Sequence, residues 1–131
     1  MADILVVEDD PALGRMWQSA LGRLGHGVRH VATVAAAKRE VSLARADVIL
    51  LDLNLGQESG LGLVTLAAYV NPQVRVLVVT GTAMFPRGEL FGLSPHIVAV
   101  LRKPVPVEQV IALIGHHGAH APGHRELQAT G

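Results

Sequence analysis

Unbroken runs of Val, Ile and Leu are the feature of this sequence that most limits its fold. Such runs, without polar alternation, are typical of strands covered on both faces, as in a parallel sheet. Run length alone does not separate them from buried helical segments, but their regular spacing favours strands. One run, at residues 27–31, is weaker than the others, which span residues 4–7, 48–51, 74–79 and 97–101.

Helical patterns occupy the intervals between these runs. In the first interval, one face of a 3.6-residue period is formed by Leu13, Trp17, Ala20, Leu21 and Leu24. Asp10 is placed to cap this helix, Pro11 suits its first position and Gly25 suits its end. Similar patterns predict three more helices, over residues 33–44 with Thr33 as cap, 58–70 ending at Asn71-Pro72, and 106–115 with Pro106 near the start.

The alternation of strands and helices predicts an α/β fold with one parallel sheet and right-handed crossovers. A length of 131 residues predicts a single domain. Residues 82–95 fit this pattern poorly, because two prolines and two glycines leave room for at most a short helix. Beyond about residue 116 the apolar period is lost, so we expect a mobile tail.

Histidines are frequent in this chain, and four of them gather in the tail: His116, His117, His120 and His124. A His-rich tail can bind Ni²⁺ or Zn²⁺, but a solvated tail of chance composition is the interpretation that we prefer. The other three are isolated, and we interpret them as surface or core-edge residues: His26, His30 and His96.

Composition excludes several classes of protein. Hydrophobic residues make up 50% of the chain and charged residues 17%, which is typical of a globular protein. Eleven basic residues balance eleven acidic ones, so charge gives no reason to expect nucleic acid or a membrane surface as partner. The absence of cysteine excludes disulfides and thiolate metal sites. Without a signal-like start or an apolar run long enough to span a bilayer, the chain is expected to be cytoplasmic.

Reactive side chains follow the predicted strands at their carboxyl ends, where ligands bind in such sheets. They are Glu8 and Asp9 after the first strand, then Asp52, Thr80 and Lys103. Three carboxylates held together are costly unless a cation neutralises them, and Mg²⁺ prefers such oxygen ligands. Asp52 could then accept a phosphoryl group, with Lys103 and Thr80 stabilising it. Each residue alone is better explained as a turn, a cap or a surface charge; the combination is what favours a site.

Four stretches carry a resemblance to a known family: "ILVVEDDP", "VILLDLNLGQESGLGLV", "VLVVTGTA" and "VLRKP". Over about residues 2–115 the chain resembles the receiver domain of bacterial two-component response regulators. The resemblance implies a flavodoxin-like (βα)5 three-layer sandwich, with a parallel sheet in the order 2-1-3-4-5. The fourth helix is expected to be short or mobile, and Gly60 falls where the family usually has glycine.

The resemblance also implies a role for each site residue. Asp52 would accept a phosphoryl group from a sensor histidine kinase or a phosphotransfer protein. Mg²⁺ would be bound by Asp9, Asp52 and the backbone carbonyl of Asn54, with Glu8 acting mainly through a bound water. Thr80 and Lys103 would contact the phosphoryl group, and Asp10 would cap the first helix.

The sequence departs from the family pattern at several positions. Val100 stands where the family usually has Phe or Tyr, so no ring is available to turn inward on phosphorylation. Any output would need another readout, such as backbone shifts around residues 81–95. Gly56 replaces a common proline, and Asn54 and Thr82 occupy positions that modulate the lifetime of the phosphoryl group in the family.

The leading interpretation is a stand-alone receiver domain at residues 1–116 with a flexible tail at 117–131. It would signal to an unidentified protein target and would turn over no separate metabolite. A second interpretation is a degenerate receiver that binds its partner without phosphorylation, as Val100 and the broken fourth helix suggest. A third, a phosphohydrolase with an aspartyl nucleophile, fits poorly because Asp52 follows the third strand and position 54 is Asn.

Overall fold

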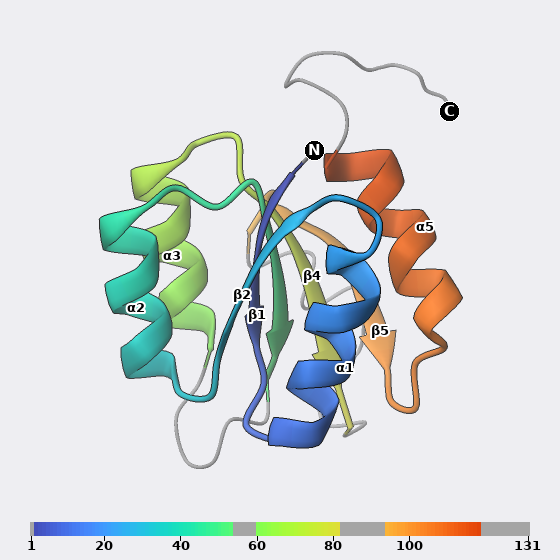
Figure 1. Ribbon diagram of the computed structural model, residues 1–131. Helices are drawn as coiled ribbons and strands as arrows, with labels where there is room; N and C mark the ends of the chain where they lie inside the picture. Colours follow the sequence, from blue (N-terminus) through green and yellow to red (C-terminus); the bar gives the residue numbers. More distant parts are fainter. Residues whose placement is uncertain (1, 54–59, 82–93, 119–131) are drawn as a thin grey trace.

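Five parallel strands form one sheet in the order β2-β1-β3-β4-β5 in the computed structural model, which describes residues 2–53, 60–81 and 94–118 (Figure 1). The strands are β1 (Asp3–Val7), β2 (Gly27–Val31), β3 (Val48–Asp52), β4 (Arg75–Thr80) and β5 (Ile97–Arg102). Every neighbouring pair is parallel. The predicted sheet, its strand order and its strand positions are therefore confirmed, each strand to within one residue at either end.

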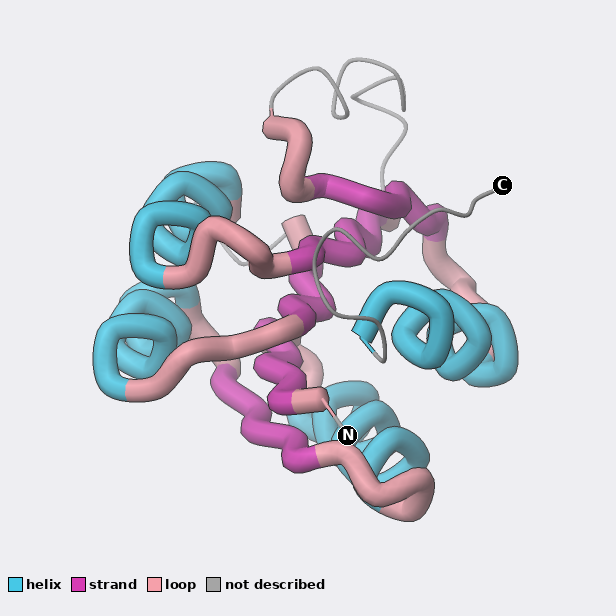
Figure 2. Tube along the Cα trace, turned by 90° about the horizontal axis from the view of Figure 1, so that it is seen from above, coloured by secondary structure: helices cyan, strands magenta, loops and turns pink. Residues whose placement is uncertain are grey.

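The described helices lie in two pairs on opposite faces of the sheet. They are α1 (Pro11–Gly22), α2 (Val34–Leu43), α3 (Leu61–Val70) and α5 (Val107–Gly118). Helices α2 and α3 cover one face and α1 and α5 cover the other, which gives three layers (Figures 1 and 2). The flavodoxin-like three-layer sandwich is thus confirmed, whereas the prediction of a short or mobile fourth helix falls largely outside the described residues.

The core explains why the strand sequences lack polar alternation. In β1, Leu5 and Val7 pack into the cluster beneath α2 and α3, whereas Ile4 and Val6 pack into the cluster beneath α1 and α5. Successive side chains of a strand point to opposite faces, so a sheet covered on both sides needs apolar residues at every position. The packing of the sandwich determines where each strand ends, and it therefore also determines the positions of the residues that follow the strands.

Two predicted helix caps are present in the structure. The Asp10 carboxylate accepts hydrogen bonds from the backbone N–H groups of Ala12 and Leu13, at 3.0 and 3.3 Å. The Thr33 hydroxyl accepts one from the N–H of Ala36, at 3.1 Å. Both satisfy donors that the first turn of a helix leaves without an intrahelical partner.

The predicted end of the first helix is wrong by two residues. Helix α1 ends at Gly22, and the chain continues through a turn in which the N–H groups of Leu24 and Gly25 bond to carbonyls three residues earlier. Gly25 has φ 94°, a left-handed value that favours glycine. This tighter turn carries Leu24 off the apolar face of the helix, and its side chain is 46% exposed.

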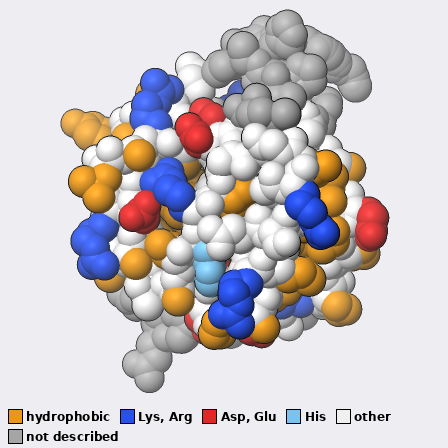
Figure 3. All heavy atoms as spheres, in the orientation of Figure 1, with side chains coloured by type: hydrophobic (Ala, Val, Ile, Leu, Met, Phe, Trp, Pro, Cys, Tyr) orange, Lys and Arg blue, Asp and Glu red, His pale blue; other side chains and the backbone are white. Residues whose placement is uncertain are grey.

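The last helix is longer than predicted. Helix α5 continues to Gly118, so the backbone of His116 and His117 is helical, whereas the rest of the predicted tail lies outside the described residues. In the described ranges no helix has both the length and the apolar character needed to cross a bilayer. On the face shown in Figure 3, basic and acidic side chains are spread among apolar ones instead of gathering by sign.

Candidate functional site

The residues that follow the strands meet at one edge of the sheet. The arrows in Figure 1 all point to this edge, at the bottom of the view. Glu8 and Asp9 follow β1, Asp52 ends β3 and Thr80 ends β4. Because β1 pairs with β3, β3 with β4 and β4 with β5, these ends lie side by side. The convergence that the sequence predicts is therefore present in the fold.

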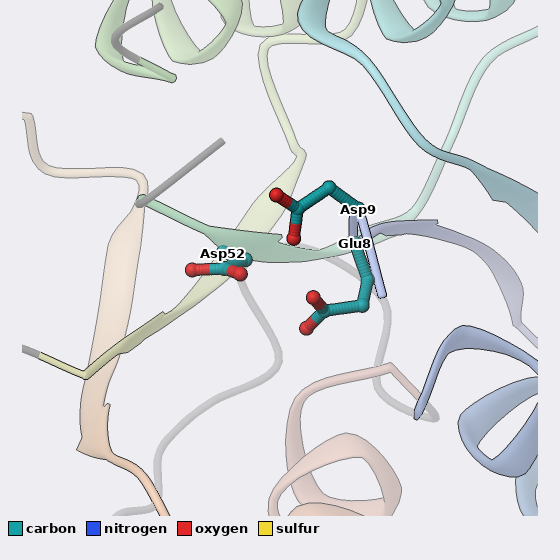
Figure 4. Close-up of side chains that lie close together, drawn as sticks. All are labelled: Glu8, Asp9 and Asp52. Atoms are coloured by element: carbon teal, nitrogen blue, oxygen red, sulfur yellow. The ribbon is translucent and has the colours of Figure 1, made fainter. Parts of the chain in front are cut away.

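Three carboxylates form the centre of this edge. Glu8, Asp9 and Asp52 each offer an oxygen, and these oxygens lie within 4.8 Å of one another (Figure 4). The side chains of Glu8 and Asp52 are each only 3% exposed, whereas Asp9 faces solvent. Two of the three acids are thus largely removed from water, while the third leaves the cluster open to an incoming ion.

Lys103 is the cation that the fold itself supplies to this cluster. Its ammonium donates a hydrogen bond to Asp52 Oδ2 at 3.0 Å and lies 3.4 Å from Glu8 Oε1. The backbone N–H of Lys103 donates to the carbonyl of Thr80 at 2.9 Å, which ties the loop after β5 to the end of β4. Thr80 is itself 5% exposed. The peptide between Lys103 and Pro104 is cis.

The pKa of the Glu8 carboxyl group is raised to about 7, chiefly by burial. The N–H of Asp10, which donates to Glu8 Oε2 at 3.1 Å, and the charge of Lys103 act against this rise, whereas the negative charge of Asp52 contributes to it. The Glu8 carboxyl group is therefore partly protonated near neutral pH, because burial and the nearby charge of Asp52 disfavour its negative form.

The pKa of Lys103 is also raised, but by attraction to the acids and against the effect of burial. Burial alone would lower it, but the hydrogen bond and the charge of Asp52, together with Glu8, outweigh burial and raise it. Lys103 is therefore ammonium at any physiological pH. Its fixed positive charge lies where negative charge would accumulate if a group were transferred to Asp52.

The donor set fits a hard divalent cation. Carboxylate oxygens are the ligands that Mg²⁺ and Ca²⁺ prefer, and no thiolate or imidazole belongs to the cluster of Glu8, Asp9 and Asp52. A bound cation would favour the charged form of Glu8, which burial and the charge of Asp52 disfavour. The predicted fourth ligand, the carbonyl of Asn54, lies outside the described residues.

The sequence matches the family model described as "Response regulator receiver domain" over residues 4–115. This chain belongs to the receiver domain family. A similar solved structure is a CheY-like receiver domain from Methanospirillum hungatei, 25% identical, with a TM-score of 0.79 and coverage of 88% of this chain and 92% of that chain. The fold described above thus agrees with the comparison.

Three further proteins place this receiver among its relatives. The regulator NtrC of Azospirillum brasilense is 34% identical over 79 residues, which are 60% of this chain and 16% of that protein. The receiver protein CpdR of Brucella abortus is 25% identical over 114 residues, 85% of this chain and 92% of that protein. A response regulator structure from Burkholderia pseudomallei contains a phosphorylated aspartic acid and a calcium ion. It is 27% identical, with a TM-score of 0.77 and coverage of 86% of this chain and 65% of that chain.

The lengths of these relatives differ widely. This receiver spans 16% and 23% of the first two curated relatives, both described as DNA-binding transcriptional regulators. It spans nearly the full length of CpdR.

A hollow of about 430 Å³ adjoins the acidic cluster of this receiver. It lies between α1 and the loop after β5, and Lys103 forms part of its wall. Its other walls are mostly apolar and are formed by Leu13, Trp17, Val79, Gly81, Pro104 and Val105. The amphipathic pattern of α1 predicts the burial of Leu13 and Trp17, but nothing in the sequence indicates that the loop after β5 leaves space beside them.

One contact at the site is not predicted by the sequence. The ring of His30, on β2, lies 2.9 Å through Nε2 from the carbonyl oxygen of Glu8, and it is half-buried. It occupies space above Gly14 of α1. A glycine inside an amphipathic helix is the one signal that indicates a close approach here.

The departures from the family pattern divide into two groups. Val100 is 5% exposed and packs in the cluster beneath α2 and α3, opposite Val78 of β4. It is therefore an ordinary core residue in the position of the usual aromatic ring. Asn54, Gly56 and Thr82, and most of the segment in which a readout is expected, lie outside the described residues.

Proposed function

We propose that this receiver accepts a phosphoryl group on Asp52 and signals through contacts with other proteins. The donor would be a sensor histidine kinase or a phosphotransfer protein. The observation that carries the proposal is the position of Asp52. Its carboxylate is 3.0 Å from the ammonium of Lys103. It also forms a cluster with Glu8 and Asp9, in which one oxygen of each residue lies within 4.8 Å of the others.

In the proposed reaction, a carboxylate oxygen of Asp52 attacks the phosphorus of a phosphohistidine. The new P–O bond forms as the P–N bond breaks, and the imidazole of the donor leaves. Lys103 offsets the charge of the transferred group, and the Thr80 hydroxyl donates a hydrogen bond to one of its oxygens. A hydrogen bond from the backbone N–H of Lys103 to the carbonyl of Thr80 holds these two residues next to each other.

Mg²⁺ is the proposed cofactor. Asp9, Asp52 and the backbone carbonyl of Asn54 would hold it directly, and Glu8 would hold it mainly through a water. Bound Mg²⁺ would supply positive charge to the phosphoryl oxygens during transfer. The choice of Mg²⁺ over Ca²⁺ belongs to the proposal, because both cations suit a set of carboxylates.

The hollow beside Lys103 suits the phosphodonor as its docking place. Its apolar walls adjoin the acceptor, so a side chain inserted there would hold the donor histidine near Asp52. The exposed positions of α1 would help to choose the kinase. This assignment rests on Lys103, which lines the hollow and also contacts Asp52 of the acidic cluster.

The proposal extends to the whole chain as a receiver at residues 1–116 with a tail at 117–131, in the cytoplasm. Its output would be an unidentified protein, with no nucleic acid or membrane as partner. CpdR supports this, since the chain covers 92% of that protein. The DNA-binding activity named for NtrC is not carried over, because the chain matches a small part of NtrC.

Incubation with acetyl phosphate and Mg²⁺, followed by intact-mass measurement, tests the proposal. The wild-type protein should gain one phosphoryl group, and the Asp52→Asn variant should gain none. Asp47→Asn is the matched control, because Asp47 is an exposed acid at the opposite end of β3 and should leave the gain unchanged. An equal gain in Asp52→Asn would remove Asp52 from its proposed role.

The same assay decides the second candidate, a receiver that binds its partner without phosphorylation. The burial of Val100 in the place of an aromatic ring is the observation that favours this candidate. A folded wild-type protein that binds Mg²⁺ but gains no mass would support it. Turnover of an aryl phosphate would instead indicate a phosphohydrolase.

A further inference from the structure

We propose that His30 is a positioning residue that fixes the acidic turn after β1 by holding the carbonyl of Glu8. The ring can reach this carbonyl only because position 14 of α1 is glycine. The consequence for cation binding rests on the proposed function, whereas the consequence for the geometry of the turn does not. This contact lies outside the acidic cluster and involves no group that would touch the cation or the phosphoryl group.

The end of β2 holds both backbone groups of Glu8. The N–H of Glu8 donates to the carbonyl of Val31 at 3.0 Å, and Nε2 of His30 lies 2.9 Å from the carbonyl of Glu8. Because a carbonyl oxygen can only accept, Nε2 must carry the hydrogen of the ring. The last two residues of an edge strand thus hold both sides of one residue at the site.

The side chain of Glu8 is held from the other direction. Its Oε2 accepts the N–H of Asp10 at 3.1 Å, and its Oε1 lies 3.4 Å from the ammonium of Lys103. With the side chain held in this way, the contact with His30 fixes the carbonyl of the peptide between Glu8 and Asp9. Asp9 follows directly and extends toward solvent. The direction of the Asp9 carboxylate depends on the orientation of this peptide.

Position 14 explains how the ring comes so close to the backbone. A Cβ atom built on Gly14 would lie less than 3.0 Å from three atoms of the His30 ring, Nε2, Cε1 and Cδ2. No side chain at this position could coexist with the ring as it lies. Glycine in a helix interior is less stable than alanine. The helix therefore carries an unfavourable residue at the place where the imidazole packs.

His96 offers a matched control within the same chain. It is half-buried, and its Nδ1 lies 3.2 Å from the backbone carbonyl of Val74, so it makes the same type of contact as His30. His96 lies just before β5, at the amino ends of the strands, whereas the acidic cluster lies at their carboxyl ends. Loss of a histidine–carbonyl contact as such can therefore be separated from loss of this particular contact.

The first experiment compares His30→Ala, His30→Gln and His96→Ala. Titration calorimetry with Mg²⁺ should show that His30→Ala weakens binding about 10-fold, the lower end of the effect of removing groups that orient metal ligands. Gln can place an amide nitrogen near the position of Nε2, so His30→Gln should bind nearly as well as wild type. His96→Ala should bind Mg²⁺ as wild type does, even if its melting temperature falls.

The second experiment tests the packing of the ring on the helix. Gly14→Ala should lower the melting temperature and weaken Mg²⁺ binding, because the methyl group displaces the ring. In the His30→Ala background the same change should no longer lower the melting temperature, since the ring is gone. Such non-additivity is expected of residues in direct contact. Additive effects of the two substitutions would contradict the contact.

Hydrogen exchange and ring NMR judge the proposal independently of any cation. His30→Ala should speed amide exchange at Asp9 and Asp10, whereas His96→Ala should not. In the wild-type protein, ¹⁵N spectra should show the His30 tautomer with hydrogen on Nε2. Hydrogen on Nδ1, or unchanged exchange in His30→Ala, would overturn the proposal. If wild type binds no Mg²⁺ but the exchange result holds, the proposed function fails while the role of His30 in the turn stands.

Discussion

Glu8 is the residue whose protonation state depends most on the fold. Its carboxyl group has an ordinary pKa of 4.5 and a pKa of about 7 in the folded protein. A group with a raised folded pKa binds its proton more tightly in the native state than in the unfolded chain. The stability that this proton contributes is fully present below pH 4.5 and is lost as the pH rises through about 7.

Glu8→Gln should therefore be more stable than wild type at alkaline pH, in the absence of divalent cations. The advantage should grow between about pH 5 and pH 8 and approach about 3 kcal/mol, at about 1.4 kcal/mol per pKa unit. Urea unfolding across this range measures it. Glu108→Gln is the control for removal of one negative charge, because Glu108 is exposed on α5 and lies outside the acidic cluster. A constant difference for Glu8→Gln would contradict the raised pKa.

Lys103 is the residue that makes two buried carboxylates tolerable. Lys103→Gln should slow phosphorylation by acetyl phosphate about 100-fold, the typical effect of removing a group that stabilises developing charge. Arg102→Gln should leave the rate near that of wild type, since Arg102 is the neighbouring cation but is exposed. Intact-mass time courses measure both rates. Equal slowing in the two variants would indicate a general effect of charge in place of the contact with Asp52.

At the scale of elements, the caps of α1 and α2 separate stability from site geometry. Asp10→Ala and Thr33→Ala should each lower the free energy of unfolding by about 1 kcal/mol, because each removes a side-chain cap. Only Asp10→Ala should also weaken Mg²⁺ binding, because loss of the cap loosens the backbone of residue 10, whose N–H donates to Glu8 Oε2. Denaturant unfolding and calorimetry measure the two effects. Equal Mg²⁺ affinities in both variants would show that the cap does not position the turn.

The strands could be predicted from the sequence to within one residue because both faces of the sheet are buried. The run around Ile49 is apolar throughout because neither of its faces meets water. Helix ends were harder to predict from the sequence, because the hydrogen bonds of the last turn depend on the local conformation of each residue. The apolar period extends to Leu24, but the turn before Gly25 follows a tighter bonding pattern. Hydrophobic pattern therefore locates an element better than it locates its end.

The site divides in the same way. Its acids and Lys103 could be predicted because residues at the carboxyl ends of neighbouring parallel strands must meet once the strand order is known. The contact between His30 and Glu8 could not, because it depends on how closely α1 approaches β2. The raised pKa of Glu8 could not either, since it follows from the burial of one side chain. Connectivity fixes which residues meet, and packing fixes their chemistry.

At the scale of the whole molecule, the two ends of the strands carry different kinds of residue. The carboxyl edge carries the acidic cluster. The opposite edge carries a buried amide, Asn71, which is 2% exposed and donates to the carbonyl of Ala46 at 2.9 Å. The same side chain accepts hydrogen bonds from Arg45 at 2.8 Å and from the N–H of Gln73 at 3.1 Å. Asn71 thus joins the loop before β3 to the loop before β4.

Asn71→Ala should therefore destabilise the protein by about 2 kcal/mol, because buried partners of the amide are left without hydrogen bonds. Well below its melting temperature, the variant should take up phosphate as fast as wild type, since the substitution lies at the far edge of the sheet. Thermal unfolding and the intact-mass time course measure the two properties. A matching loss of phosphorylation in folded protein would show that the two edges are coupled.

The location of the phosphoryl group tests the central claim most directly. After reaction with acetyl phosphate and Mg²⁺, borohydride reduces an aspartyl phosphate to homoserine, which marks its position. Asp52 and Asp47 lie in the same tryptic peptide, residues 46–75, and tandem mass spectrometry distinguishes them. Homoserine at position 52, with Asp47 intact, is the result predicted here. Modification at Asp9, at Asp47 or at a histidine, with Asp52 intact, would contradict the assignment of Asp52 as the acceptor.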